Sequence, residues 1–317
     1  MRLVYKMEKF LITGGAGYIG SILTEHLLEK KHSVTCLDNL SYHQRSLMSH
    51  ASNPNFNFVY GDVRDEELLT SIVPEFSAII PLAAIVGAPA CKISPHDTRS
   101  INHDAVMLLN EIRNYDQKLI FPSTISVYGM QPKEQCTEES PLNPVSLYAE
   151  KKADSEKALV ISDKDSVILR LATVFGASPR MRTDLLVNDF VMKAAGEGYL
   201  VLYEGHVMRN YIHVRDIARA FEHCIQNYEI MKNGIFNVGL KENFSKLDLA
   251  KKIKQHVPLL EIIASEIGED VDKRDYRISS EKIERTGFTP IFSLDRGVEE
   301  LIKVKDILLK NNPYKNI

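Results

Sequence analysis

The stretch Thr13-Gly14-Gly15-Ala16-Gly17-Tyr18-Ile19-Gly20 lies between a short apolar run and an amphipathic one. The spacing predicts a strand, a tight turn and a helix, in which Gly14 permits the turn and Gly17 lets the backbone approach a pyrophosphate. Gly20 lets the helix pack closely on the strand. The phosphates would lie at the helix N-terminus, where free N–H groups and the helix dipole favour negative charge. A glycine-rich turn without a ligand is the alternative, but the strand–turn–helix context that the motif requires is present.

A carboxylate follows this motif at the distance that dinucleotide binding needs. Asp38 ends the next apolar run, 18 residues after Gly20, close to the spacing of a residue that binds the adenosine ribose hydroxyls. A carboxylate there repels a 2′-phosphate, and the residues that follow, Asn39 and Leu40, supply no cation to accommodate one. The sequence therefore favours NAD over NADP.

Further along the chain, short apolar runs alternate with amphipathic segments as far as about residue 175. The runs are nearly continuous in apolar residues and are bounded by turn formers, which is typical of parallel strands covered on both faces. We therefore predict an α/β fold, a Rossmann-like doubly wound parallel sheet that binds ligands at the carboxyl ends of its strands. The predicted strands are 9–13, 33–37, 56–60, 78–81, 118–122 and 167–171, and the predicted helices are 19–30, 66–73, 100–114 and 146–161.

The pattern changes after about residue 176. A turn-rich basic loop over 177–182 precedes a predicted helix over 185–195, and the charge-rich stretch 243–278 is predicted to be irregular. A helix over 217–226 and a strand over 234–238 are expected to rejoin the sheet. The predicted organisation is an NAD-binding Rossmann domain over residues 1–176, which the chain re-enters at about 212–240, and a smaller C-terminal substrate-binding lobe mainly over 177–317.

Composition excludes several other classes of protein. Lys and Arg number 39 against 42 Asp and Glu, a net charge of −3, so no nucleic-acid binding is expected. No window approaches the roughly 20 apolar residues that a membrane span requires. The four cysteines form no CxxC pair, so neither a metal site nor a disulfide framework is indicated. We expect a cytoplasmic enzyme that acts on small molecules.

Tyr148 and Lys152 stand at i and i+4, on one face of a predicted helix. A phenol with a pKa near 10 is a poor base at neutral pH, but an ammonium one turn away and a positive nicotinamide ring would lower that pKa. Such a tyrosine could take a proton from a sugar hydroxyl whose carbon loses hydride. Tyrosine and lysine on a helix more commonly belong to a solvated face. Their place after a strand that ends in Thr124, whose hydroxyl would orient the same oxygen, favours the catalytic interpretation.

Six features recur along the chain: TGGAGYIG at 13–20, the strand-end Asp38, GDV at 61–63, LAA at 82–84, the S-T-x-x-V-Y-G run at 123–129 and YxxxK at 148–152. Together they resemble the extended short-chain dehydrogenase/reductase family, which contains NAD-dependent nucleotide-sugar epimerases and dehydratases. The resemblance covers essentially the whole chain. It implies that Tyr148 is the base, that Lys152 lowers its pKa and binds the nicotinamide ribose, and that Thr124 is the hydroxyl partner. The implied NAD-binding residues are Gly14, Gly17, Tyr18, Ile19, Gly20, Asp38, Asn39, Asp62, Val63, Leu82, Ala83, Ala84, Tyr148 and Lys152. The implied substrate-binding residues are Thr173, Arg180, Asn188, Arg209 and Arg274, of which Arg209 and Arg274 match positions that contact the nucleotide diphosphate.

The sequence also departs from the family pattern. Dehydratases generally carry Asp and Glu after the catalytic threonine, as the acid and base that remove water across C5 and C6, whereas this chain has Ile125 and Ser126. An alkyl side chain exchanges no protons, so 4,6-dehydration is disfavoured. Thr173 replaces the family's usual asparagine. His213 is predicted to be a satisfied buried histidine, and 132–141 a surface loop.

The remaining expectation is oxidation at C4 of a nucleotide-linked sugar, by a 4-epimerase that returns the hydride or a C4 dehydrogenase that releases the ketone. Segments 79–92 and 267–276 resemble GDP-manno-heptose 4-dehydrogenases of bacterial capsule synthesis. The alternatives are a 4,6-dehydratase and, in another class, a catalytically silent NAD-binding regulatory protein. The resemblance also implies a homodimer, in which helices 100–114 and 146–161 pair with their symmetry mates.

Overall fold

A parallel sheet of seven strands forms the centre of the protein in a computed structural model, which describes residues 7–265 and 274–310. Every pair of neighbouring strands in this sheet is parallel. The strand order changes direction between β1 and β4, where a doubly wound sheet binds its ligands. The predicted α/β class and Rossmann-like sheet are confirmed. From one edge to the other the strands are β12 (Ile235–Val238), β7 (Ser166–Leu171), β5 (Lys118–Thr124), β4 (Ala78–Pro81), β1 (Lys9–Thr13), β2 (Ser33–Asp38) and β3 (Phe56–Tyr60).

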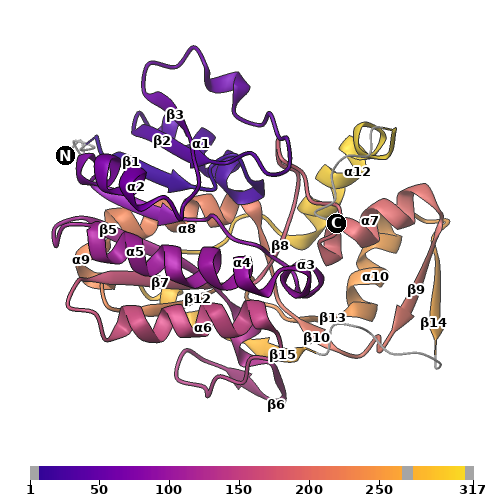
Figure 1. The fold of residues 1–317 in the computed structure, drawn as a ribbon. Coiled ribbons are helices and arrows are strands. Elements are labelled where there is room, and N and C mark those ends of the chain that lie inside the picture. The colour runs from indigo at the N-terminus through magenta and orange to yellow at the C-terminus, as the bar shows by residue number, and fades with distance from the viewer. Residues whose placement is uncertain (1–6, 266–273, 311–317) are drawn as a thin grey trace.

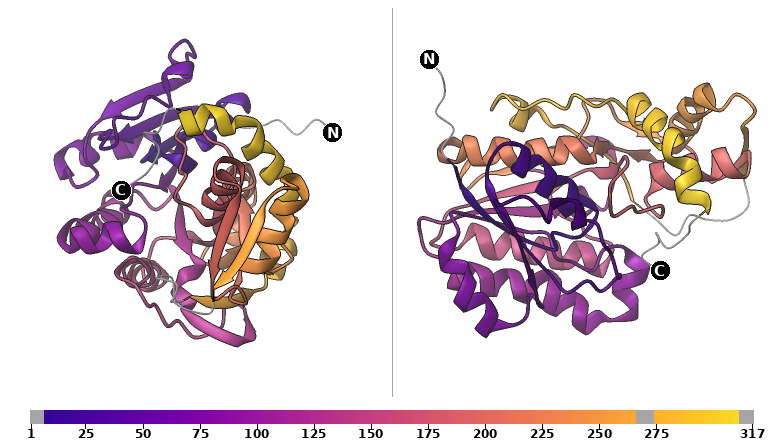
Figure 2. Two further views of the ribbon diagram at one scale, coloured as in Figure 1. Left: turned by 90° about the vertical axis from the view of Figure 1, so that its right-hand side faces the viewer. Right: turned by 90° about the horizontal axis from the view of Figure 1, so that it is seen from above.

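Helices cover both faces of this sheet (Figures 1 and 2). Successive side chains of a strand point to opposite faces. In β1, Phe10 and Ile12 therefore join one apolar cluster and Leu11 joins another. Burial on both faces explains why the strands read as continuous apolar runs rather than as alternating ones. The first cluster includes α1 (Tyr18–Glu29) and α8 (Val214–Gln226), and the second includes α2 (Glu66–Ile72), α5 (Ala105–Ile112) and α6 (Leu147–Val160).

One predicted helix is interrupted. The sequence predicts a single helix over 100–114, but the structure has α4 (Pro95–Arg99), a π-helical turn at Ser100–Asp104 and then α5. The buried Asn102 lies in this turn, where its side-chain amide accepts from the backbone N–H of Ile85 and donates to the carbonyl of Ile85, both at 2.8 Å. We attribute the widened turn to this two-way contact, which ties the helix to the segment that follows β4.

The stretch 243–278 also differs from its prediction. Its described part contains α10 (Lys246–His256), which begins with a capping box between Ser245 and Asp248. Four charged residues of this stretch, Asp248, Lys251, Lys252 and Lys254, lie on the sides of α10 that its buried residues Leu249, Ala250 and Ile253 leave to solvent. The described residues of the stretch also form three strands, β13 (Phe244–Ser245), β14 (Glu261–Ser265) and β15 (Asp275–Ile278). Likewise, the predicted loop over 132–141 begins as the strand β6 (Met130–Cys136), which pairs with β15.

A smaller lobe lies beyond the carboxyl ends of the strands, at the right of Figure 1. In it, α7 (Leu186–Gly196), α10 and α12 (Leu294–Lys310) pack on one another. β9 (Tyr199–Tyr203) pairs with β14, and β10 (Met208–Arg209) with β13. Two short parallel strands, β8 (Thr173–Phe175) and β11 (Tyr211–His213), lead out of and back into the sheet domain. Within the described residues, no helix is both long and apolar enough to cross a membrane.

Candidate active site

The glycine-rich loop lies at the carboxyl end of β1, against the segment that follows β4. Gly14 has a φ of +71°, and a Cβ at this position would lie 2.6 Å from the backbone N of Ala83. A Cβ on Gly20 would lie 2.4 Å from the carbonyl O of Gly14. The side chain of Tyr18 is buried, and its hydroxyl donates to the carbonyl O of Gly176 at 2.6 Å. The glycines therefore allow the compact turn, and Tyr18 anchors it to the loop after β8.

The N-terminus of α1 fits a phosphate group. Gly17 is the N-cap of this helix, no side chain in the described part of the chain caps it, and its first turn holds no acidic residue. By contrast, Asp65, Ser146 and Ser245 cap α2, α6 and α10 with their side chains. An uncapped helix N-terminus leaves N–H groups and the positive end of the dipole for an anion. The residues present therefore fit the pyrophosphate of a dinucleotide.

Asp38 ends β2 beside this loop, where three donors fix its carboxylate. Oδ2 accepts from the N–H of Ala16 at 3.0 Å, and Oδ1 accepts from the N–H of Leu40 at 2.8 Å and from Nε2 of Gln44 at 3.1 Å. Burial raises the pKa of Asp38, while these backbone contacts and the charge of Arg180 act in the opposite direction. Asp38 thus has the position that the sequence assigns to the ribose carboxylate.

The residues that the resemblance assigns to NAD include a second carboxylate, Asp62. Arg64 binds both oxygens of Asp62 at 2.8 Å, and Nδ2 of Asn39 lies 3.3 Å from Oδ2 of Asp62. These contacts hold the pKa of Asp62 at about 2. Val63 is buried, and the 82–84 segment is half-buried directly after β4. All of these residues lie at the carboxyl edge of the sheet, as adenosine binding requires.

The catalytic candidates meet where β5 ends against α6. The hydroxyl of Thr124 accepts from the N–H of Ser126 at 3.1 Å and donates to Oγ of Ser126 at 3.0 Å. Nζ of Lys152 donates to the carbonyl O of Pro122 at 2.8 Å. Tyr148 is half-buried in the first turn of α6, and no described residue forms a hydrogen bond with its hydroxyl. The Tyr148 hydroxyl therefore keeps its full hydrogen-bonding capacity for a ligand, whereas Thr124 and Lys152 already have partners in the protein.

Electrostatics around this pair favour the neutral forms in the protein alone. Burial raises the pKa of the Tyr148 phenol to about 12, while the charges of Arg182 and Arg274 act in the opposite direction. Burial lowers the pKa of the Lys152 ammonium to about 8, and the carboxylate of Glu156 opposes that shift. Low dielectric disfavours charge on both groups. The bound nicotinamide would add the positive charge that a tyrosinate needs.

Three arginines lie near the residues predicted to bind the substrate, and the sequence interpretation missed one of them. The carbonyl O of Arg274 accepts from Arg209, and Nη1 of Arg274 donates to Oγ of Ser126 at 2.5 Å. The two arginines predicted for the diphosphate are therefore neighbours, and Arg274 also reaches the serine beside Thr124. The missed residue is Arg182, which pairs with Asp184 at 2.5 Å and whose charge acts on Tyr148. The basic run 180–182 was its only signal in the sequence.

The other predicted substrate residues have different surroundings. Thr173 is half-buried in β8. Asn188 is fully buried: its amide N donates to Tyr18 Oη at 3.2 Å and to the carbonyl O of Arg182 at 2.8 Å, and its Oδ1 accepts from the N–H of Gly176. These contacts make Asn188 a support for the loop and give no backing to direct substrate contact. Arg180 packs on Tyr42, in the loop that follows Asp38, rather than beside Arg209 and Arg274.

His213 has the structural role that the sequence predicts. It is fully buried, its ring stacks on Phe292 with 4.5 Å between centroids, and its Nε2 lies 3.0 Å from Oε2 of Glu300. Nδ1 accepts from the N–H of Arg215 and caps α8. Both ring nitrogens are thus used within the protein, so His213 is not a catalytic candidate.

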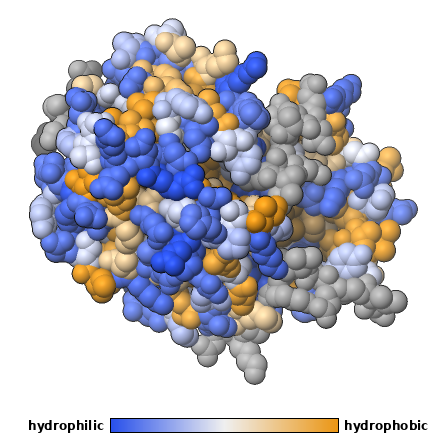
Figure 3. Space-filling model, viewed as in Figure 1, coloured by the Kyte–Doolittle hydropathy of each residue, from blue (hydrophilic) through white to orange (hydrophobic). Residues whose placement is uncertain are grey.

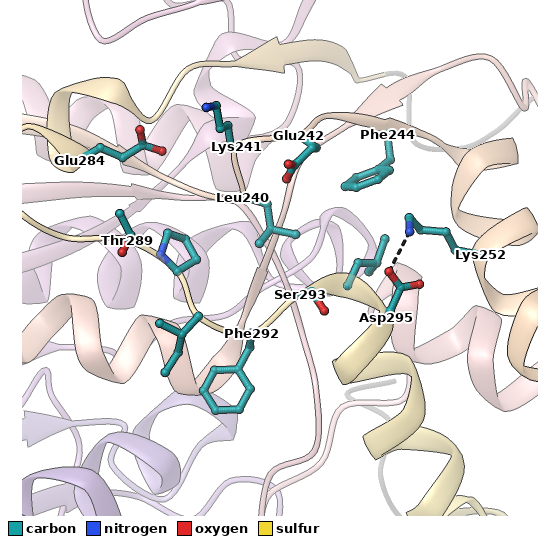
Figure 4. A pocket seen from close by; sticks show the side chains of 13 residues that line it. Leu240, Lys241, Glu242, Phe244, Lys252, Glu284, Thr289, Phe292, Ser293 and Asp295 are labelled. Carbon is teal, nitrogen blue, oxygen red and sulfur yellow. Dashed lines mark hydrogen bonds and ion pairs between the residues drawn. The ribbon is translucent and has the colours of Figure 1, made fainter.

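A separate cavity of about 680 Å³ opens between the loops 240–244 and 289–295 (Figure 4). Leu240 and Phe244 line it, and an ion pair between Lys252 and Asp295 at 2.8 Å lies at its edge. None of the residues predicted for the site, all of which the structure describes, lines this cavity. The candidate active site is therefore defined by the side chains at the carboxyl ends of β1, β2, β4 and β5.

The fold and these side chains define a dinucleotide-binding enzyme with a tyrosine–lysine pair beside the central sheet. The chain belongs to the NAD dependent epimerase/dehydratase family, whose model matches residues 10–239. Its cofactor is accordingly NAD, and the protein is an enzyme. The resemblance stated from the sequence motifs is confirmed at the level of the family.

Relatives within this family catalyse different reactions. The low-salt glycan biosynthesis protein Agl12 of Haloferax volcanii is 29% identical over 307 residues, which cover 92% of this chain and 96% of that protein. A UDP-glucose 4-epimerase of Lactobacillus helveticus is 29% identical over 273 residues, 78% of this chain and 81% of that one. The structure of DesIV, a dTDP-glucose 4,6-dehydratase from Streptomyces venezuelae with NAD and TYD bound, is 25% identical with a TM-score of 0.84, covering 97% of this chain and 100% of that one. The coarse activity is therefore that of a nucleotide-sugar epimerase or dehydratase.

Proposed function

We propose that the protein oxidises C4 of a nucleotide-linked sugar, as a 4-epimerase or as a C4 dehydrogenase. The observation that carries this proposal is the group of side chains after β5. Thr124 and the Tyr148–Lys152 pair are present, whereas the two positions after Thr124 hold no carboxylate. Ile125 is buried in the core, and the hydroxyl of Ser126 is engaged by Thr124 and Arg274. The set suffices for proton transfer at one hydroxyl and lacks the acid–base pair of a dehydratase.

The chain's own residues account for the proton movements at C4. NAD supplies the hydride acceptor when it is bound. Thr124 orients the C4 hydroxyl, and the Tyr148 phenolate accepts its proton. Lys152 holds a positive charge next to that phenolate and binds the ribose. Because Nζ of Lys152 is held by the carbonyl of Pro122 at 2.8 Å, the ammonium is positioned before substrate arrives.

The substrate side supports an anionic ligand. Arg209 and Arg274 are adjacent, and guanidinium groups bind phosphate through paired hydrogen bonds. We propose that they contact the diphosphate of a GDP- or UDP-linked sugar. A GDP-heptose of surface-polysaccharide synthesis is the specific candidate, supported by the resemblance of 79–92 and 267–276, although 267–273 lies outside the described residues. We also propose that residues 1–176 with 212–240 bind NAD and that the rest of 177–317 binds the sugar nucleotide.

Two further features are part of the proposal. We propose a homodimer, because Ile101, Leu108 and Ile112 are apolar but only partly buried against the core. They belong to the helical segments at the front of Figure 1. The same face appears mostly hydrophilic with scattered apolar patches (Figure 3). We propose the cytoplasm as its location, since the four cysteines are buried and form no disulfide in the described part of the chain, as is usual in a reducing compartment.

Product analysis tests the reaction. The purified enzyme is incubated with UDP-, GDP- and dTDP-sugars, and the masses of the products are measured by mass spectrometry. An unchanged mass with an inverted C4 identifies the epimerase, and a loss of two hydrogens identifies the dehydrogenase. Absorbance near 340 nm reports trapped NADH. Loss of water would contradict the proposal and favour the 4,6-dehydratase, with an acid–base pair from elsewhere in the fold.

A further inference from the structure

Arg180 lies at the adenosine end of the cofactor site, although the family resemblance places it at the substrate. It comes from the loop between β8 and α7, and only 6% of its surface is exposed. Its guanidinium carbon lies 4.9 Å from the centre of the Tyr42 ring. Tyr42 belongs to the loop that follows Asp38 at the end of β2. The loop after β8 therefore reaches from the smaller lobe to the residues predicted to bind the adenosine ribose.

Contacts with the glycine-rich motif hold this loop in place. Oγ of Ser178 donates to the carbonyl O of Tyr18 at 2.7 Å and lies 3.0 Å from Oγ of Ser21. The hydroxyl of Tyr18 in turn donates to the carbonyl O of Gly176 at 2.6 Å. The segment that presents Arg180 is thus pinned on the first turn of α1, where the phosphates of the cofactor are expected. Contacts within the protein therefore fix the position of the segment that carries Arg180.

We infer that Arg180 forms the outer wall of the adenosine site and, together with Asp38, sets the choice between NAD and NADP. A guanidinium is planar and permanently charged, so it can stack on an aromatic ring and can bind a phosphate through paired hydrogen bonds. In the wild-type protein, the Asp38 carboxylate binds the ribose hydroxyls and repels a 2′-phosphate. Nη1 of Arg180 donates to the carbonyl O of Met181, and without the Asp38 carboxylate the positive charge of this guanidinium would attract a 2′-phosphate.

The position of Arg180 changes one conclusion drawn from the sequence, that no cation lies near Asp38. Asn39 and Leu40 indeed supply no cation, but the tertiary structure brings one from Arg180, 142 residues after Asp38. The positive charge of Arg180 also lowers the pKa of the Asp38 carboxyl against the effect of burial, as expected of close neighbours. The inference depends on the NAD dependence of the family and is independent of the reaction proposed at C4, so each can fail without the other.

Binding of cofactor fragments tests the inference without any sugar substrate. ADP-ribose and 2′-phospho-ADP-ribose share the adenosine half and differ in the 2′-phosphate, and both are titrated by calorimetry. Arg180→Met should weaken binding of ADP-ribose about three- to tenfold, the usual worth of a stacked cation. Asp38→Asn should shift the preference toward 2′-phospho-ADP-ribose by about tenfold or more, and Asp38→Asn with Arg180→Met should show a shift several-fold smaller, because only the relief of repulsion remains.

A matched control and a second variant keep the test decisive. Arg296 is exposed on α12 and its guanidinium carbon lies 4.2 Å from the Phe292 ring centre, so Arg296→Met removes a stacked arginine outside the site and should change neither affinity. Tyr42 is 41% exposed, so Tyr42→Leu should fold and should weaken ADP-ribose binding about three- to tenfold even if Arg180→Met does not fold. The inference is overturned if Tyr42→Leu binds ADP-ribose as the wild type does, or if the double variant keeps the preference of Asp38→Asn.

Discussion

At the scale of single residues, burial shifts the pKa values of the two catalytic candidates on α6 in opposite directions. It raises the pKa of the Tyr148 phenol to about 12 and lowers the pKa of the Lys152 ammonium to about 8. Both shifts favour the neutral form, because a low-dielectric environment disfavours charge. A tyrosinate near neutral pH therefore requires additional positive charge close to the phenol. A bound nicotinamide would supply such a charge, so Tyr148 is expected to act as the base in the loaded enzyme.

Replacing the phenol tests its role as the base. Tyr148→Phe should reduce turnover by roughly 10²–10⁴-fold, the usual worth of a positioned proton acceptor, with little change in NAD affinity. Steady-state kinetics with the true nucleotide sugar and calorimetric titration of NAD measure the two effects. Tyr115 is an exposed tyrosine outside the site, and Tyr115→Phe is the control that should behave as the wild type. Normal turnover in Tyr148→Phe would remove this residue from the mechanism.

The buried lysine predicts how stability depends on pH. Below about pH 8, Lys152 is protonated in both the folded and the unfolded protein. Between pH 8 and its unfolded pKa of 10.5, the unfolded chain keeps a proton that the folded protein has released, so the free energy of unfolding rises with pH. From pH 7.5 to 9.5, NAD-free wild type should gain about 2 kcal/mol relative to Lys152→Met.

Urea denaturation at the two pH values measures this difference. Lys157 is exposed on the same helix, so Lys157→Met is the matched control and should keep the pH dependence of the wild type. An equal pH dependence in the wild type and in Lys152→Met would contradict the assignment of the shift to this lysine.

At the scale of the elements, a buried polar network joins α6 to the sheet behind the catalytic residues. Glu156 accepts from Arg170 of β7, with the closest pair at 2.7 Å, and Ser123 of β5 also donates to Glu156. Arg170 donates to the hydroxyl of Tyr128 at 2.9 Å, which donates to Oδ1 of Asn237 at 2.8 Å. The network connects β5, β7 and β12 through side chains that are nearly inaccessible to water. It thereby holds the strand that ends in Thr124 against the helix that carries Lys152.

Breaking this network should be costly. Arg170→Met leaves Glu156 as an uncompensated buried charge and should lower the free energy of unfolding by about 3–5 kcal/mol. Arg170→Met combined with Glu156→Gln removes both charges and should recover part of that loss. Lys151 and Asp154 form an ion pair at 2.6 Å near the surface of the same helix, so Lys151→Met should cost less than about 1 kcal/mol. Equal losses in Arg170→Met and Lys151→Met, measured by urea denaturation, would refute this account.

At the scale of the whole molecule, the loop after β8 links the two parts of the structure. It carries Arg180 to the adenosine side and Arg182 toward Tyr148, and Asn188 of α7 supports it from behind. Residues proposed for the substrate side and for the cofactor side therefore share one short segment.

Assembly is the last prediction at this scale. A two-fold dimer through the face of α5 and α6 would cover Leu108, which is only partly buried in the single chain. Light scattering at micromolar concentration should give twice the mass of the chain, and Leu108→Glu should give the mass of one chain. Ile307 is 62% exposed on α12, and Ile307→Glu should leave the dimer intact. A single-chain mass for the wild type would refute the dimer.

The sequence by itself determined the parts of the protein that depend on neighbouring residues. Strands 9–13, 56–60 and 78–81 have the predicted bounds, because their apolar runs end at turn formers. The strand–turn–helix at Gly14–Gly20 follows from glycine geometry, and Tyr148 and Lys152 share a helix face because they are four residues apart. These features identify the family and the core of the site. Each of them is encoded within about a turn of helix or a single loop.

Only the tertiary structure decided which residues distant in the sequence meet. It placed Arg180 on Tyr42, Arg274 on Ser126 and Arg170 on Glu156, and it widened the helix at Asn102 through a contact with Ile85. Local propensity carries no information on such contacts, because they depend on the path of the chain between the two residues. That path is set by how the sheet, its covering helices and the smaller lobe bury their apolar faces together. The Tyr148–Lys152 pair was therefore predictable from the sequence. The distant residues that surround the site could be identified only from the tertiary structure.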